Sequence, residues 1–107
     1  MLVTEREEVI LLEKQIEAWM RKQIEKMGGK FFKFVSPGND GVPDRIAILP
    51  GGFICFVELK RDGEKLRELQ EHVCQGLEEL GCSVRRVRGM DEAVQVIEWM
   101  RSKVDGI

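Results

Sequence analysis

The sequence predicts an α/β domain with a three-layer core, in which a mixed β-sheet is flanked by helices. Apolar residues at helical spacing occupy both ends and one middle stretch of the chain. Strand-like apolar runs lie between them, and segments containing Gly or Pro separate the elements. The predicted order is α-β-β-β-α-β-α. The 107 residues suffice for one core and contain no repeat or linker, so we expect a single domain over residues 1–107.

An amphipathic helix is predicted over residues 5–27, because apolar side chains recur there at helical spacing and Gly28-Gly29 follows as a stop signal. Residues 30–35 (KFFKFV) are typical of a short strand. A loop rich in Gly, Pro, Asn and Asp then spans residues 36–42. This loop directly precedes Asp44, and we expect that it can accommodate a phosphate backbone.

A β-hairpin is predicted next. An apolar run that begins at Asp44 and a second run over residues 53–60 (FICFVELK) are separated by the turn signal Pro50-Gly51-Gly52. Side chains along a strand alternate between its two faces, so Glu58 and Lys60 share one face.

The register of this hairpin decides whether Asp44 meets Glu58. If the turn pivots on Gly51, the two residues lie opposite each other, with Cβ atoms about 5 Å apart on the same face. A slip of one residue would place Asp44 opposite Leu59, on the wrong face. A site that contains both carboxylates therefore requires the first of these registers.

The remaining elements are a helix over residues 65–80, a strand over residues 83–88 (SVRRVR) and a helix over residues 90–103. We expect the last strand to lie parallel to the strand over residues 53–60, through a right-handed connection. The apolar side of the helix over residues 65–80 is expected to carry Leu66, Leu69, Val73, Leu77 and Leu80. The inward side of the helix over residues 90–103 is expected to carry Ala93, Val94, Ile97 and Met100.

Asp44, Glu58 and Lys60 are the residues that most clearly indicate chemistry. Two carboxylates this close repel each other, and a hard divalent cation compensates for the repulsion. Mg²⁺ prefers oxygen ligands at about 2.1 Å, so Asp44, Glu58 and the carbonyl of Leu59 could form one side of its shell. Lys60 would lie beside the attacking water, where it could orient the nucleophile or neutralise charge that develops on a phosphoryl group.

At these residues the chain resembles the PD-(D/E)xK nuclease superfamily and, within it, the VRR-NUC domain family. The match consists of Pro43-Asp44 followed by Glu58-Leu59-Lys60. Gly41 in the form Gly-x-Pro-Asp, Gln70 in the following helix and the segment over residues 83–88 are similar to VRR-NUC in particular. The resemblance covers nearly the whole chain and implies a restriction-endonuclease-like fold.

The resemblance also implies an activity. It is that of an endonuclease, dependent on Mg²⁺ or Mn²⁺, that hydrolyses phosphodiester bonds and leaves a 5′-phosphate and a 3′-hydroxyl. Branched DNA, such as a Holliday junction or a flap, is the implied substrate. The chain is similar to the stand-alone viral and bacterial members, so we expect it in the cytoplasm of a bacterial host, with a phage gene as one source.

The resemblance also has an implication for oligomeric state, because stand-alone family members that cut branched DNA look like homodimers with two active sites that face two strands. We therefore expect a homodimer. Apolar residues beyond the needs of a small core could form its interface, and packing within one chain is the alternative for each of them. They are Leu11, Leu12, Trp19 and Trp99.

The family pattern includes a glutamate on the first helix, and Glu13 and Glu17 are both candidates. At about 100° per residue, five apolar residues of this helix lie within roughly 60° of Glu13, and Glu17 lies at the edge of their arc. They are Val9, Ile16, Met20, Ile24 and Met27. A carboxylate on a buried face is costly unless it is paired or binds metal. We assign the role to Glu13 as a metal ligand or supporting acid, with Glu17 as the alternative. The resemblance implies that Gln70 supports the site from the neighbouring helix.

Composition limits the other functions. The net charge is −2, which gives no general support to nucleic-acid binding, although many basic residues lie between residues 30 and 88. The three cysteines lack a Cys-x-x-Cys spacing and are typical of buried thiols. The single histidine, His72, is expected on a helix surface, so a zinc site is not indicated. We expect neither a membrane span nor a nucleotide cofactor, because a long apolar run and a phosphate-binding Gly-Lys-Ser/Thr loop are both missing.

Two alternatives remain open from the sequence. The chain could be a DNA-binding or assembly module that has the nuclease fold without activity, which the negative net charge would suit. It could also be an unrelated small α/β protein in which Pro-Asp and Glu-x-Lys occur by coincidence. The register of the hairpin tests the second alternative.

Overall fold

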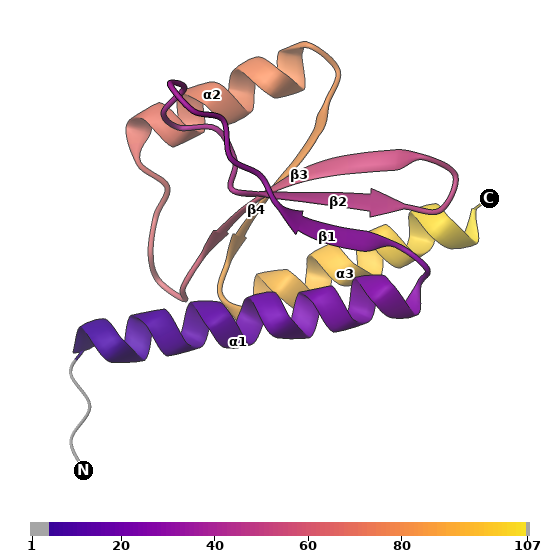
Figure 1. Cartoon of the computed structure of the whole chain (residues 1–107), viewed down its shortest axis with the longest axis horizontal. Helices are drawn as coiled ribbons and strands as arrows, with labels where there is room; N and C mark the ends of the chain where they lie inside the picture. The colour runs from indigo at the N-terminus through magenta and orange to yellow at the C-terminus, as the bar shows by residue number, and fades with distance from the viewer. Residues whose placement is uncertain (1–4, 107) are drawn as a thin grey trace.

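Three helices enclose a four-stranded mixed β-sheet, which confirms the predicted class and element order (Figure 1). The computed structural model describes the backbone of residues 5–106 and the side chains of residues 12–106. Helices α1 and α3 cover one face of the sheet and α2 covers the other, so the fold has three layers (Figure 1). The elements are α1 (Glu5–Lys26), β1 (Lys30–Lys33), β2 (Arg45–Leu49), β3 (Phe53–Lys60), α2 (Glu68–Glu79), β4 (Ser83–Arg88) and α3 (Met90–Asp105).

The boundaries agree with the predicted ones to within two residues, except at the start of α2. This helix begins at Glu68 instead of at residue 65. Arg67 has an extended backbone, with φ −69° and ψ 155°, and the N–H of Glu64 donates to the carbonyl of Arg61 at 3.1 Å. The turn at residues 61–64 is therefore followed by residues 65–67, which apolar spacing alone had placed in the helix and which precede it in the structure.

The strands lie in the order β1-β2-β3-β4, with the first three antiparallel and β4 parallel to β3, as expected. Between β2 and β3, Arg45 pairs with Val57 and Leu49 with Phe53, so the hairpin pivots on Gly51. Gly51 has φ 87°, a left-handed conformation that favours glycine. The register required for a site with both carboxylates is therefore confirmed.

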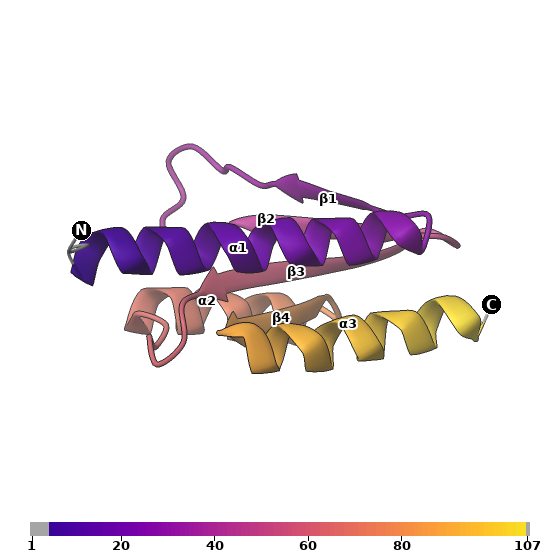
Figure 2. The ribbon, with the colours of Figure 1, turned by 90° about the horizontal axis from the view of Figure 1, so that it is seen from below.

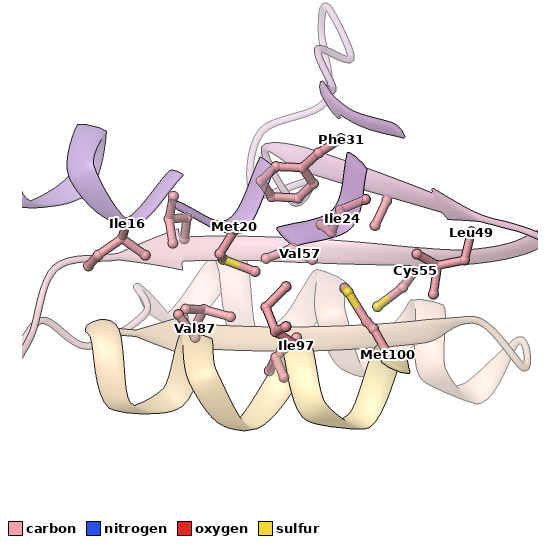
Figure 3. Close-up of a cluster of buried hydrophobic side chains, with 14 residues drawn as sticks. Ile16, Met20, Ile24, Phe31, Leu49, Cys55, Val57, Val87, Ile97 and Met100 are labelled. Carbon is pink, nitrogen blue, oxygen red and sulfur yellow. The ribbon is translucent and has the colours of Figure 1, made fainter. Parts of the chain in front are cut away.

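The hydrophobic core lies between the sheet and the layer formed by α1 and α3. Figure 3 shows Ile16, Met20 and Ile24 of α1 lying toward Val57 of β3 and Ile97 of α3, and each of these residues is at most 3% exposed. Burying a side chain of this size contributes about 1.5–3 kcal/mol. Figure 2 shows α1 and α3 running side by side across the same face of the sheet.

The core fixes the direction of the polar residues in β3. Cys55, Val57 and Leu59 all belong to the buried cluster. Because side chains alternate along a strand, Glu58 and Lys60 project from the opposite face, which α2 covers. The thiols of Cys55 and Cys74 are buried, as expected, whereas Cys82 is only partly buried. Burial raises the pKa of Cys55 to about 12.

The predicted inner side of α2 is partly wrong. Leu69 is 46% exposed and Leu80 is 81% exposed, whereas Gln70 and Cys74 are buried. Leu66 and Leu80 lie outside the helix, so their spacing does not indicate its inner side. The helix also covers the polar face of β3, and a buried glutamine on its inner side suits that surface.

The predicted inner side of α3 needs one correction. Ala93, Ile97 and Met100 are buried as expected, but Val94 is 37% exposed and Val96 takes its place at 8%. These apolar residues are close together in sequence, and only their packing against β4 and α1 shows which of them face inward.

The residues proposed for a dimer interface have mixed positions. Trp19 and Trp99 pack against the core of the chain, and the ring of Trp99 lies edge-on to Phe53 with centroids 5.5 Å apart. Leu12 is 44% exposed, and the side chain of Leu11 lies outside the described residues. The two tryptophans therefore serve the monomer. Within residues 5–106, no helix offers an apolar stretch that could cross a bilayer.

Candidate active site

The segment from Gly41 to Asp44 is held in place by close packing against α2 and by a backbone hydrogen bond beyond the end of β1. Gly41 has φ 86°, and a Cβ built there would lie 2.9 Å from Cγ of Leu69, so only glycine allows this approach. Pro43 is fully buried. The N–H of Phe34 donates to the carbonyl of Asp44 at 2.9 Å, which extends the pairing of β1 with β2. These contacts hold Asp44 at the end of the sheet.

Asp44 lies beside Glu58, as the pivot at Gly51 requires. One step beyond the pair of Arg45 and Val57, the ladder places Asp44 opposite Glu58. Oδ1 of Asp44 accepts a hydrogen bond from the N–H of Leu59 at 3.3 Å. The side chain of Asp44 is 44% exposed, whereas Glu58 is only 2% exposed. The pair thus combines one accessible carboxylate with one buried carboxylate.

Glu58 is electrostatically strained. Burial, and then the nearby negative charge of Asp44, raise the pKa of Glu58 to about 8, although Lys60 and Arg67 act in the opposite direction. A buried carboxylate next to a second one is compensated by a proton or by a cation. Without a cation, Glu58 is therefore largely protonated near neutral pH.

Lys60 is close enough to influence this pair. Its side chain is 16% exposed, its charge lowers the pKa of Glu58, and its Nζ lies 3.6 Å from Oε1 of Glu64. Lys60 and Glu58 are two residues apart on one strand and share a face. The structure therefore gathers Asp44, Glu58 and Lys60 at one end of the β2–β3 hairpin.

A cavity of about 240 Å³ opens beside this group, between α1 and the ends of the strands. Its lining includes both candidate acids of the first helix and three basic residues. The lining residues are Glu13, Lys14, Glu17, Lys33, Asp44, Arg45 and Leu59. Glu58 does not line the cavity, so the cavity reaches the pair from the side of Asp44.

The two helix acids differ in their partners. Glu17 accepts hydrogen bonds from Arg21 and from Arg45. Burial alone would raise the pKa of Glu17, but the hydrogen bond and charge of Arg21, joined by those of Arg45, outweigh it and lower the pKa. Glu13 lines the same cavity, and none of the ion pairs between described side chains involves it. Among the described side chains, Glu17 is thus the paired acid of this helix and Glu13 the one without an ion pair.

Gln70 is buried at the start of α2, and its Oε1 accepts a hydrogen bond from the N–H of Arg67 at 2.9 Å. This bond satisfies a backbone donor where the helix begins, as a capping side chain does. Arg67 is also close enough to lower the pKa of Glu58. Gln70 therefore shapes the end of the helix that faces the pair.

The arginines of β4 are less available to phosphates than their number suggests. Arg86 is paired with Glu71 and Glu78, and Arg88 is paired with Glu92. The guanidinium carbon of Arg85 lies 3.7 Å from the centre of the Trp99 ring. β4 is an edge strand of the sheet, and charged side chains on an edge strand disfavour pairing with a strand of another molecule.

The donor set fits a divalent cation. Asp44 and Glu58 provide carboxylate oxygens, and a cation would compensate for both the burial and the repulsion by Asp44 that raise the pKa of Glu58. Among the described side chains, no three from Asp, Glu, His and Cys lie near enough to form a metal site by themselves. A cation at the pair would depend on backbone oxygen and water as well, which is usual for Mg²⁺.

Sequence reasoning gave no individual role to Lys33 and Arg45, which the structure places beside Asp44. The position of Arg45 directly after Asp44 was a signal, but adjacent residues of a strand point to opposite faces. Only the fold shows that its side chain turns back to the Asp44 carboxylate and to Glu17.

The chain is similar to known proteins in sequence and in fold. The sequence matches no protein-family model. Over 65 residues it is 48% identical to "Putative nuclease p44" of Acyrthosiphon pisum secondary endosymbiont phage 1, a match that spans 59% of this chain and 70% of that protein. A solved structure described as "VRR_NUC domain" has a TM-score of 0.73 and 27% identity, and the match covers 80% of this chain and 94% of the other.

Proposed function

This chain belongs to the VRR-NUC family of nuclease domains, and we propose that it is a metal-dependent endonuclease that cuts branched DNA. The observation that carries the proposal is the pair of Asp44 and Glu58, which lies with Lys60 at one end of the hairpin. Such a pair can hold a divalent cation next to a phosphate.

Asp44 and Glu58 would hold Mg²⁺ or Mn²⁺, together with the carbonyl oxygen of Leu59. Glu13, which lines the same cavity as Asp44, would complete or support the site. When bound, the cation would supply positive charge for the phosphate and ease deprotonation of the attacking water. Binding also requires that Glu58 give up its proton, so metal affinity should rise with pH.

Lys60 would orient the attacking water and stabilise the charge that develops on the phosphate. In-line attack on phosphorus would break the bond to the 3′-oxygen, leaving a 5′-phosphate and a 3′-hydroxyl. Lys14 and Lys33 line the cavity beside Asp44, where they can contact phosphates of the bound strand. Gln70 would support the arrangement by fixing the start of α2 next to Glu58.

The branched substrate and the homodimer are proposed together. A four-way junction presents two equivalent strands, and two copies of this chain would present two sites to them. The VRR-NUC resemblance supports both proposals. The chain's net charge of −2 suits selective binding through a local cationic region better than general binding along duplex DNA.

The role of Lys60 gives the sharpest test of the mechanism. In the Lys60→Ala variant we expect cleavage of a labelled four-way junction to fall by on the order of 100-fold or more, because an electrostatic contact to the transition state is removed. DNA binding, measured by fluorescence anisotropy, should stay close to that of the wild type. Duplex and flap substrates in the same assay would rank the preferred structure.

Lys22→Ala is the matched control, since Lys22 is an exposed lysine of α1 that does not line the cavity. It should cut as the wild type does. Cleavage by Lys60→Ala at the wild-type rate would contradict the mechanism. A folded wild type that binds the junction without cutting any substrate would favour the alternative, a DNA-binding module with a nuclease fold.

A further inference from the structure

We propose that Arg45 is a positioning residue, anchored by Glu17 of α1, that fixes the Asp44 carboxylate in the orientation needed to bind metal. One arm of this proposal rests on the proposed function, because it concerns the cation that Asp44 would hold. The other arm concerns the orientation of Asp44 in the metal-free protein and stands apart from catalysis.

The contacts of Arg45 form a short fork. Its Nη1 donates to the backbone carbonyl of Asp44 at 2.9 Å and lies 3.4 Å from Oδ2 of the same residue. Its Nη2 donates to Oε2 of Glu17 at 3.2 Å. The planar guanidinium makes these contacts at once, so the position of Glu17 on the helix is transmitted to the carboxylate of Asp44.

Asp44 is held from both sides as a result. The N–H of Leu59 donates to Oδ1, and Arg45 lies against Oδ2. The side chain of Arg45 is 12% exposed, which limits the conformations it can adopt, whereas that of Asp44 is 44% exposed. An accessible carboxylate would turn freely about its own bonds if its two oxygens had no fixed partners.

Glu17 is itself fixed by a second arginine. Arg21, one turn further along α1, donates to Oε1 of Glu17 and also to the carbonyl of Phe31 at 2.6 Å. Arg21 thus connects α1 to β1, while Arg45 connects Glu17 to the first residue of β2. Arg21 does not touch Asp44 in any of the described contacts, so it provides a control that shares the same acid.

Two physical effects of Arg45 on metal binding have opposite signs. As a positive charge near Asp44, Arg45 would repel a cation, and its removal would tighten binding. As an orienting partner, it lowers the cost of arranging Asp44, and its removal would weaken binding. Loss of an outer partner of a metal ligand typically weakens affinity about 10–100-fold. The sign of the change therefore separates the two roles.

The first arm of the test measures hydrogen exchange of the Leu59 amide in metal-free protein. In Arg45→Gln this amide should exchange on the order of fivefold faster than in the wild type, because Asp44 no longer holds Oδ1 against it. Val57, two residues earlier and fully buried, is the internal reference for general loosening of the strand. Arg21→Gln should leave the Leu59 rate unchanged relative to Val57.

The second arm measures Mn²⁺ binding to the same proteins by calorimetry, with a thermal melt to show that each is folded. Arg45→Gln should bind Mn²⁺ about 10–100-fold more weakly than the wild type. Arg45→Lys should also bind weakly, because a single ammonium keeps the charge but cannot serve Glu17 and Asp44 together. Arg21→Gln should bind within about twofold of the wild type.

The proposal is overturned if Arg45→Gln binds Mn²⁺ as tightly as the wild type or more tightly, or if its Leu59 amide exchanges at the wild-type rate. An equal loss in Arg21→Gln, which keeps both Glu17 and Arg45, would also overturn it, since the effect would then come from general loosening of α1 against β1. A wild type that binds no Mn²⁺ would contradict the proposed function, and the Leu59 exchange rates would still decide for or against the role of Arg45.

Discussion

Asp44 and Glu58 are chemically similar side chains in very different environments. Asp44 faces the cavity, with Arg45 against one carboxylate oxygen, whereas Glu58 is almost fully buried beneath α2. Burial and the charge of Asp44 raise the pKa of Glu58 to about 8. The difference lets the fold tolerate two neighbouring carboxylates without metal, because one of them can hold a proton.

This asymmetry predicts a pH-dependent stability. The folded-state pKa of Glu58 is raised above its usual value of 4.5, so the folded protein binds this proton more tightly than the unfolded chain does. The stability that Glu58 provides is complete below about pH 4.5 and is lost as the pH rises toward 8. Each unit of pKa difference amounts to about 1.4 kcal/mol.

Glu58→Gln removes this titration and keeps the shape of the side chain. In EDTA, we expect it to melt at a temperature close to that of the wild type at pH 5, and higher by at least about 4 °C at pH 8. Glu98→Gln, at an exposed position of α3, is the control for loss of a negative charge. Identical pH dependence of the melting temperature in the wild type and Glu58→Gln would show that folding does not raise the pKa of Glu58.

The residues of the hairpin could be predicted from the sequence because their geometry is local. Alternation along a strand and a glycine turn suffice to place Asp44 opposite Glu58, and the structure confirms that register. The choice between Glu13 and Glu17 depends on contacts far apart in sequence. Glu17 meets Arg45 across 28 residues, a contact that no helical spacing reveals.

At the scale of elements, α2 shows how a helix can present a polar side to the interior. Helical spacing of apolar residues predicted the existence of this helix but not its start or its inner side. Gln70 is buried because it caps the helix and covers the face of β3 that carries Glu58. The side of α2 that faces the sheet is therefore set by the polar residues of β3 and not by the spacing of the apolar residues in the helix.

The capping bond of Gln70 predicts a stability effect. Gln70→Ala leaves the N–H of Arg67 without its partner and should lower the free energy of unfolding by about 1 kcal/mol, measured by urea denaturation. Gln75→Ala, at an exposed position of the same helix, should change it by less than about 0.5 kcal/mol. Equal stability of the two variants would mean that the hydrogen bond from Arg67 to Gln70 does not contribute to the free energy of unfolding.

The support that Gln70 gives to the active site stays a prediction.

At the scale of the whole molecule, the layers separate stability from chemistry. One face of the sheet packs against α1 and α3 and forms the core, and α2 lies over the other face (Figure 1). Glu58 and Lys60 alternate with the core residues of β3, so they project from that second face. The apolar periods of the helices and strands predicted this architecture. The cavity beside Asp44 could not be predicted, because it arises where α1 passes the ends of strands that are distant in sequence.

The central claim is that Asp44 and Glu58 form a metal-dependent nuclease centre. Its most direct test is the initial rate of cleavage of a labelled four-way junction by wild type and Asp44→Ala, in Mg²⁺, in Mn²⁺ and in EDTA. Circular dichroism would confirm that both proteins are folded. We predict cutting by the wild type only with a metal, and none by Asp44→Ala. Cleavage in EDTA, or by Asp44→Ala at the wild-type rate, would contradict the claim.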